Sequence, residues 1–288
     1  MNRNAPQPFF LPAQTGQRFC LYHSPNPPHS PVTAGCVLHI HAFAEEMNRC
    51  RRMAAVTASR LASQGLGVLQ MDLYGCGDSS ADFADATWDS WKSDLELALA
   101  WLNQKHAGPV SLWADRLGAL LALDFLRTVE VKIDRLLLCQ PVMDGTDYLN
   151  RLNRMQLARQ MLNKPTNDAS AMVAMAALTA EIGIEIAGYN IAASLIRTMT
   201  QLQPADWLVP VNQIHWLEMT RQSTQEPTQE PTQGMPNKRQ QFLAHWQTTG
   251  NPVQLHLING PSYWQTPEVS VSTEWIAACS NAFRDAQS

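Results

Sequence analysis

Apolar and polar positions along this 288-residue chain follow two alternating periods. Mostly apolar runs of strand length stand at 35–41, 67–72, 110–113, 135–142, 211–219 and 253–258. Apolar residues recur at helical spacing over 42–64, 88–102, 117–125, 239–246 and 273–283. Two short β-type runs around Thr15 and Gly16 predict a leading hairpin. Strands that alternate with helices predict an α/β fold with a mainly parallel central sheet and right-handed crossovers.

Residues 144–206 interrupt this alternation. They are rich in Ala, Leu and Met and helical in period, which predicts a helical cap inserted above the carboxyl ends of the strands. The core would then consist of residues 1–143 and 207–288. Within its second part, the sequence T-Q-E-P occurs twice in tandem and opens a third copy, so a flexible polar loop is predicted over 221–236.

Composition narrows the class of protein. A hydrophobic content of 45% with 16% charged residues is typical of a globular protein with a sizeable core. A net charge of -4 lacks the basic footprint of nucleic-acid binding. The six cysteines form no C-x-x-C pairs and no metal-ligand spacing, so we expect buried reduced thiols, no metal and no cofactor. The start of the chain does not resemble a signal peptide and no run could span a membrane, which predicts a cytoplasmic protein without a transmembrane segment.

The join between the strand at 110–113 and the following helix carries the most specific motif. It reads Ala114-Asp-Arg-Leu-Gly118, with small residues two places before and two places after Arg116. This layout between a strand and a helix is the nucleophile elbow of the α/β-hydrolase fold. The small residues let strand and helix pack closely while the central residue is held in a strained conformation. In a working hydrolase that residue is Ser, Cys or Asp, and here it is arginine.

Other motifs extend this likeness over nearly the whole chain. The turn D-L-Y-G-C-G-D-S at 72–79 is similar to the D-x-x-G-x-G-x-S segment of esterase-like α/β hydrolases. Together with A-E-E-M-N-R-C-R-R at 44–52, the Arg-bearing elbow and the late W-Q-T-P-E, it resembles the exosortase A system-associated hydrolase 2 family. The resemblance implies ester or thioester hydrolysis, and a setting in bacterial exopolysaccharide and PEP-CTERM protein-sorting loci with protein partners from that system.

The catalytic triad of such a fold follows the chain order nucleophile, acid, histidine. Arg116 holds the first position, and a guanidinium stays protonated and cannot attack a carbonyl. The acid position falls on Glu218 or on Asp144. The histidine position, just after the last strand, holds Tyr263 or Trp264. Because the nucleophile and its base are both replaced, a standard Ser–His–acid mechanism is not expected.

The remaining groups still predict a pocket suited to an anion. Backbone N–H groups near Ala42 and Phe43 and at Leu117 would form an oxyanion hole, toward which the elbow helix directs its positive end. Addition of Arg116 favours a carboxylate, phosphate or sulfate.

Glu45 and Trp264 complete the predicted ligand-binding residues. The alternative is that Arg116 pairs internally with Glu45, Glu46 or Glu218 and fills an inactive site, since buried charges are normally paired.

Two further residues could support unorthodox chemistry. Asp115 could replace the nucleophile, although a motif centred on it would place Trp113 and Leu117 at the two small positions. His41 ends its strand at the pocket and shares a face with His39, so it could act as a base or as a structural hydrogen-bond partner.

Three functional hypotheses follow from these residues. The first is a hydrolase-like protein without the usual triad that binds a small anionic or acylated molecule under its cap. The second is an active ester or thioester hydrolase, or an acyltransferase, that uses Asp115 or a water as nucleophile and His41 or Glu45 as base. The third is a non-catalytic interaction module in exopolysaccharide assembly. An open cavity beside a strained elbow would favour ligand binding, whereas Arg116 buried against a glutamate with no cavity would favour a scaffold.

Overall fold

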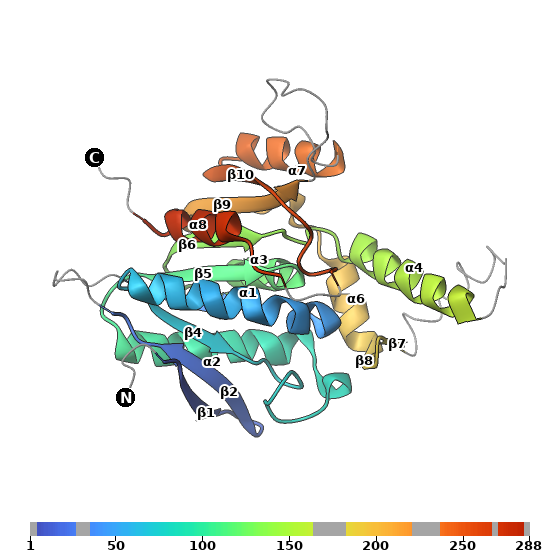
Figure 1. Cartoon of the computed structure of the whole chain (residues 1–288), viewed down its shortest axis with the longest axis horizontal. Helices are drawn as coiled ribbons and strands as arrows, with labels where there is room; N and C mark the ends of the chain where they lie inside the picture. The colour runs from blue at the N-terminus through green and yellow to red at the C-terminus, as the bar shows by residue number, and fades with distance from the viewer. Residues whose placement is uncertain (1–4, 27–34, 164–182, 221–236, 267–269, 285–288) are drawn as a thin grey trace.

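The computed structural model describes residues 5–26, 35–163, 183–220, 237–266 and 270–284 (Figure 1). Eight strands form one sheet in the order β1-β2-β4-β3-β5-β6-β9-β10, in which β1, β2 and β4 pair antiparallel and all other neighbours pair parallel. Their bounds are Gln7–Pro12, Gln17–His23, Cys36–Ile40, Gly67–Met71, Val110–Asp115, Ile133–Cys139, Val211–Thr220 and Val253–Asn259 for β1 to β6, β9 and β10. The predicted hairpin and mainly parallel sheet are confirmed.

Helices cover both faces of this sheet. One face carries α1 (Ala44–Ser63) and α8 (Thr273–Ala282), and the other carries α2 (Trp88–Lys105), α3 (Leu117–Thr128) and α7 (Asn237–Thr248) (Figure 1). Because side chains alternate along a strand, Leu112 of β5 packs in the α2–α3 layer and Trp113 in the α1–α8 layer. Burial of both faces explains why the central strands are continuous apolar runs.

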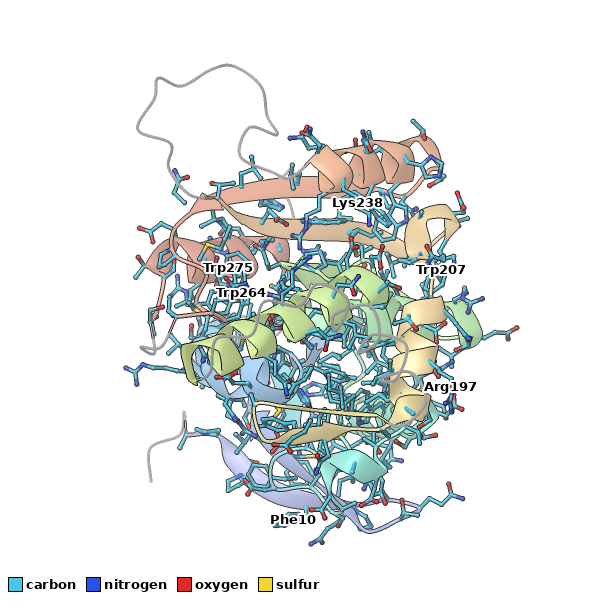
Figure 2. The ribbon with its side chains drawn as sticks, turned by 90° about the vertical axis from the view of Figure 1, so that its right-hand side faces the viewer. Phe10, Arg197, Trp207, Lys238, Trp264 and Trp275 are labelled. Atoms are coloured by element: carbon cyan, nitrogen blue, oxygen red, sulfur yellow. The ribbon has the colours of Figure 1, made fainter. Side chains whose placement is uncertain are left out.

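The described parts of the segment between β6 and β9 lie across one end of the sheet (Figures 1 and 2). They contain α4 (Gly145–Asn163), β7 (Ile184–Ile186), β8 (Tyr189–Ile191), α6 (Ala193–Gln201) and a 3₁₀ turn at Pro204–Asp206. The sequence predicted helices only, so the small hairpin β7–β8 is new. Its turn at Ala187 and Gly188 has φ of 52° and 84°, and positive φ at both central residues is typical of a type I′ turn. The predicted flexible loop at 221–236 lies outside the described residues.

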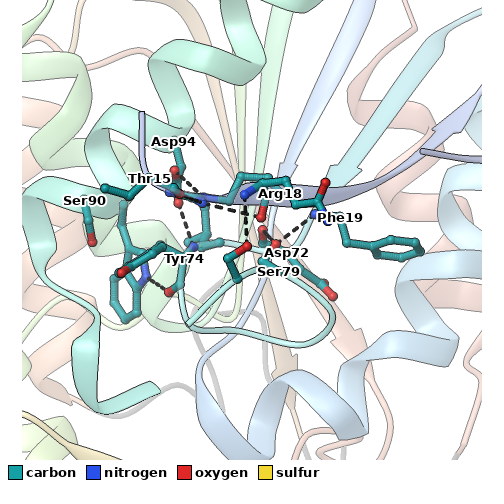
Figure 3. Close-up of polar contacts among 12 residues, drawn as sticks. Thr15, Arg18, Phe19, Asp72, Tyr74, Ser79, Ser90 and Asp94 are labelled. Atoms are coloured by element: carbon teal, nitrogen blue, oxygen red, sulfur yellow. Dashed lines mark hydrogen bonds and ion pairs between the residues drawn. The ribbon is translucent and has the colours of Figure 1, made fainter. Parts of the chain in front are cut away.

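The turn after β4, which carries the D-L-Y-G-C-G-D-S motif, is fixed to β2 and α2 (Figure 3). Arg18 Nε donates to Asp94 Oδ1 at 2.6 Å, and Asp94 Oδ2 accepts from the backbone N–H of Tyr74 at 2.7 Å. The backbone N–H of Phe19 donates to Ser79 Oγ at 2.9 Å. These bonds tie the loop to the strand and helix beside it, so these residues of the motif fix the architecture of the turn.

Candidate functional site

Arg116 stands at the junction of β5 and α3 in a strained backbone conformation. Its φ of 54° and ψ of −119° lie in a region that L-residues rarely adopt, at a cost of about 1–3 kcal/mol. Two residues later, a Cβ on Gly118 would meet the backbone oxygens of Ile40 and His41 at 2.7 Å and 2.6 Å. Only glycine therefore allows α3 to approach β3 this closely. This is the elbow geometry that the sequence motif predicts.

The Arg116 side chain is buried and paired. It is 3% exposed; Nε and Nη2 donate to the two oxygens of Glu46 at 3.3 Å and 3.4 Å, and Nη1 donates to the Gln140 carbonyl at 2.6 Å. Trp264 lies against the guanidinium, with 4.8 Å from Cζ to the ring centroid. Burial alone would lower the pKa of Arg116, but Glu46 outweighs it and the pKa lies above its ordinary value. Arg116 is therefore a permanent cation at this site.

Glu46 on α1 binds more than one partner. Arg151 Nη2 and the Tyr148 hydroxyl, both on α4, donate to Glu46 at 2.6 Å and 3.2 Å. Burial would raise the pKa of Glu46, but the charges of Arg116 and Arg151 hold it below its ordinary value. The Glu46 carboxylate thus connects α1 to the elbow and to α4, and it forms ion pairs with two guanidinium groups. We call Arg116, Glu46, Tyr148 and Arg151 the Arg116 cluster.

Glu218, the predicted acid, lies near the end of β9 and pairs with an arginine. Arg239 Nη1 on α7 contacts both of its oxygens, and Trp216 Nε1 donates to Oε2 at 3.0 Å. Gln140 Nε2 donates to Oε1 at 2.7 Å. Since the Gln140 carbonyl also accepts from Arg116, Gln140 connects the elbow to the acid position. Burial lowers the pKa of Arg239, as do the charges of Arg116 and Arg151, against the attraction of Glu218.

These arginines border a cavity of about 290 Å³ between α4, α7 and the elbow. Arg116, Arg151, Lys238 and Arg239 contribute the cationic part of its lining. Asp144 and Asp147 contribute the acidic part, and Lys238 pairs with both of them. The apolar part of the lining comes from Val142, Met143, Tyr148, Pro204, Ala205 and Phe242. The elbow residue is therefore both paired with a glutamate and open to a cavity, which combines the two outcomes that were expected to exclude each other.

The predicted oxyanion-hole residues Ala42, Phe43 and Leu117 do not line the cavity of about 290 Å³. A second cavity of about 30 Å³, the space of about one water molecule, is lined by Phe43, Glu45, Glu46 and Trp264 among others. Glu45 pairs with Arg49 on the same helix rather than with Arg116. Ala42 and Leu117 are buried and line neither of these two cavities.

The two residues predicted at the histidine position separate after β10. Tyr263 packs edge-on against Trp275, with ring centroids 5.3 Å apart, in the α1–α8 layer. Burial, with the nearby charge of Asp115, raises the pKa of its hydroxyl well above the usual range. Trp264 is the one that contacts Arg116.

The candidates for unorthodox chemistry are held in other hydrogen bonds. Asp115 Oδ2 contacts His39 Nε2 at 3.0 Å and Oδ1 accepts from Trp113 Nε1 at 2.9 Å; with Gln70, which contacts His39, they form what we call the Asp115 cluster. His41 Nδ1 contacts the Ala42 carbonyl at 2.6 Å, and Nε2 accepts from the backbone N–H of Leu73 at 3.2 Å. Both ring nitrogens of His41 are therefore used by the backbone, and burial lowers its pKa.

The described residues offer neither a metal centre nor a membrane-spanning helix. No three His, Cys, Asp or Glu side chains among them gather as metal ligands. In the same part of the chain, no helix has the length and apolar character needed to cross a membrane. All six cysteines are buried free thiols, as the sequence predicted.

Sequence reasoning missed Tyr148, Arg151 and Arg239, which lie among the polar positions of helices and carry no local motif. The position of Gln140 in the sequence could have identified it as a site residue. It directly follows a buried parallel strand, where side chains commonly face a ligand crevice. It also has a φ of 45°, which is strained for a residue other than glycine.

Comparison with known proteins places this geometry in a family. The chain is similar to Est1E from Butyrivibrio proteoclasticus with bound ferulic acid (TM-score 0.59, 13% identity, 96% of each chain). It is also similar to a proline iminopeptidase from Mycobacterium smegmatis (TM-score 0.60, 15% identity, 96% of this chain and 97% of that one). A thioesterase domain from the curacin biosynthetic pathway aligns with a TM-score of 0.56 and 17% identity, over 97% of this chain and 99% of that one. At these identities the likeness shows the fold alone.

The curated proteins gave no sequence match. The model of the family described as "serine aminopeptidase, S33" matches residues 31–205, which is more than half of the chain and includes the elbow and the turn after β4. The protein therefore has the α/β-hydrolase fold and belongs to the serine aminopeptidase S33 family.

Proposed function

We propose that this protein is a hydrolase-like binding protein, which holds a small anionic or acylated molecule in the cavity beside Arg116 and does not carry out Ser–His–acid hydrolysis. The observation that carries the proposal is the elbow guanidinium, which is buried, permanently charged and open to a cavity of about 290 Å³. Buried arginines that border a pocket bind carboxylates and phosphates through short charge-assisted hydrogen bonds.

The surroundings of Arg116 support binding over catalysis. A nucleophile must be deprotonated by a base within about 2.6–3.2 Å. The predicted histidine position holds Tyr263 or Trp264, and the predicted acid Glu218 pairs with Arg239. The two carboxylate oxygens of Asp115 are hydrogen-bonded to His39 and Trp113. Both ring nitrogens of His41 are hydrogen-bonded to backbone groups. Hydrolysis or acyl transfer through Asp115 and His41 would require these contacts to break.

The narrower family setting is part of the same proposal. The motifs at 44–52 and 72–79 and the Arg-bearing elbow resemble the exosortase A system-associated hydrolase 2 family. We therefore place the ligand and any protein partners in an exopolysaccharide or protein-sorting system. A cytoplasmic location and a cap formed by 144–206 remain predictions of the sequence.

A paired activity and binding assay tests the proposal. Wild-type protein should neither hydrolyse p-nitrophenyl acetate and butyrate nor react with a fluorophosphonate probe, and it should bind 3-phenylpropanoate or phenyl phosphate in calorimetry. Arg116→Ala should abolish binding. Arg127→Ala is the control, because this arginine lies on the same helix with a half-exposed side chain and pairs with Asp124 outside the cavity.

Two results would overturn the proposal. One is turnover by the wild type that disappears in Asp115→Asn or His41→Ala, which would establish unorthodox catalysis. The other is absence of binding of both probes by folded wild-type protein, which would leave an interaction module with an unused cavity.

A further inference from the structure

The charge balance around the cavity narrows the ligand class, and this step rests on the proposed function. We infer that the ligand is a monoanion, a carboxylate attached to an apolar body of roughly a dozen heavy atoms, rather than a phosphate. Three features of the described residues carry the inference: the number of charges at the inner end of the cavity, the exposure of the charges at its mouth, and the apolar wall between them.

At the inner end, three guanidinium groups share two carboxylates. Glu46 pairs with Arg116 and Arg151, and Glu218 pairs with Arg239. Among the residues that the structure describes, this set holds one net positive charge. Buried ions are tolerated when they are paired, so a single negative charge completes the set. A dianion would leave one negative charge without a partner in a poorly solvated place.

Some N–H groups of Arg239 and Arg116 are not used in the described hydrogen bonds and could donate to that anion. Arg239 donates to Glu218 only through Nη1 among the described contacts, which leaves Nε and Nη2. Arg116 uses one hydrogen on each terminal nitrogen, for Gln140 and Glu46, and a guanidinium carries two on each. A carboxylate, with two oxygens in one plane, matches the fork of an arginine.

The charges at the mouth contribute less to selectivity. Lys238 lies between Asp144 and Asp147, and this group holds one net negative charge. The Lys238 side chain is 68% exposed and that of Asp147 is 57% exposed. The side chains of Arg151 and Arg239 are 24% and 25% exposed and that of Asp144 is 29% exposed. Water and salt screen the more exposed charges more strongly, so the set around the buried Arg116 determines which anion fits.

The apolar lining of the cavity determines the size and the apolar character of the uncharged part of the ligand. Val142, Met143, Pro204 and Phe242 line the cavity and offer no charge. An apolar cavity of about 150 Å³ holds one benzene ring. The volume of about 290 Å³ is roughly twice that size, which suits an aryl or branched alkyl acid better than an inorganic ion.

Calorimetry with three matched probes tests the inference at pH 7.5. The probes are 3-phenylpropanoate (monoanion), phenyl phosphate (mostly dianion, with a second pKa of about 6 for such esters) and 3-phenylpropanamide (neutral). Wild-type protein should bind the carboxylate about tenfold or more tighter than either of the others. Glu218→Gln raises the inner charge by one and should move the preference toward phenyl phosphate by about tenfold. Asp147→Asn adds the same charge at the exposed mouth and should leave the preference nearly unchanged.

The outcomes separate this inference from the proposed function. Binding of phenyl phosphate in preference to the carboxylate by wild type would overturn the inference and leave the binding function intact. Binding of no probe by folded protein would overturn both. Equal shifts of preference in Glu218→Gln and Asp147→Asn would contradict the role of the inner charge count. If Glu218→Gln fails to fold, as judged by circular dichroism, Glu46→Gln makes the same change of charge at the inner end.

Discussion

Asp115 and Arg116 are neighbours in the chain, yet their side chains belong to two differently organised regions. In the Asp115 cluster, His39 and Trp113 each contact one oxygen of a single carboxylate, and His39 and Gln70 line a cavity of about 180 Å³. The Arg116 cluster sets two guanidinium groups against one carboxylate and borders a cavity of about 290 Å³. Burial is similar in both, with Asp115 and Arg116 2% and 3% exposed. Burial, pairing and a neighbouring cavity are therefore common to both clusters, and the Arg116 cluster differs in having two guanidinium groups that share one carboxylate.

The largest expected effect is on stability, and it should differ between the two regions. Glu46→Ala leaves Arg116 and Arg151 without their shared partner, and removal of one member of a buried ion pair costs about 3–5 kcal/mol. Asp115→Asn keeps the shape and one acceptor, so about 1–3 kcal/mol is expected. Urea unfolding measures both.

Glu45→Ala is the matched control for Glu46→Ala. It removes the neighbouring acid on α1, whose pair with Arg49 is partly exposed and should contribute only about 0.3–0.5 kcal/mol. A Glu46→Ala loss no larger than that of Asp115→Asn would mean that the Arg116 cluster has no special dependence on its single carboxylate.

Acid should lower the free energy of unfolding in two pH windows, one set by buried histidines outside the Arg116 cluster and one that includes Glu46 of that cluster. Burial lowers the pKa of His41 below its ordinary 6.5, so the unfolded chain takes up the proton first and stability falls as the pH drops below about 6.5. His23, His215 and His256 also have lowered pKa values, that of His215 being about 4, and they act in the same direction. The pKa of Glu46 lies below its ordinary 4.5, so its contribution is present above about pH 4.5 and lost below it.

The free energy of unfolding, measured in urea from pH 8 to pH 3.5, should therefore fall in two stages. Glu46→Gln should keep the decline between pH 6.5 and 4.5 and reduce the decline below it, to which Asp124 and Asp144, whose pKa values are also lowered, still contribute. A flat profile between pH 6.5 and 4.5 would contradict the buried neutral state of the histidines.

The sequence predicted the sheet and the elbow well because both depend on local pattern. Period and turn chemistry over 67–142 determine strands, helices and the approach of Gly118 to the Ile40 and His41 carbonyls. The sequence also named Glu45, Glu46 and Glu218 as possible partners for Arg116 and left the choice open; Glu45 pairs with Arg49. That choice depends on side-chain direction, and only Glu46 reaches the elbow, while Glu218 meets Arg239.

The residues that line the cavity were harder to predict from the sequence. Arg151 and Arg239 come from helices far from Arg116 in sequence, and a polar residue on a helix carries no local sign of which tertiary surface it meets. The hairpin β7–β8 was missed because two three-residue strands are too short to show a period.

The smallest expected effect concerns the contact between Trp264 and Arg116. Trp264→Leu removes a cation–π contact of 4.8 Å to a buried guanidinium, at a cost of about 0.5–2 kcal/mol in unfolding free energy. Because Glu46 and Gln140 still hold Arg116, the Kd for 3-phenylpropanoate should rise only about two- to threefold. Trp207→Leu is the control, since Trp207 lies 4.6 Å from the half-exposed Arg127 and does not line the cavity. Its binding should equal that of the wild type. If the two variants bind alike, the orientation of Arg116 depends on its hydrogen bonds alone. If only Trp264→Leu loses affinity, the aromatic residue at the histidine position has become part of the anion site.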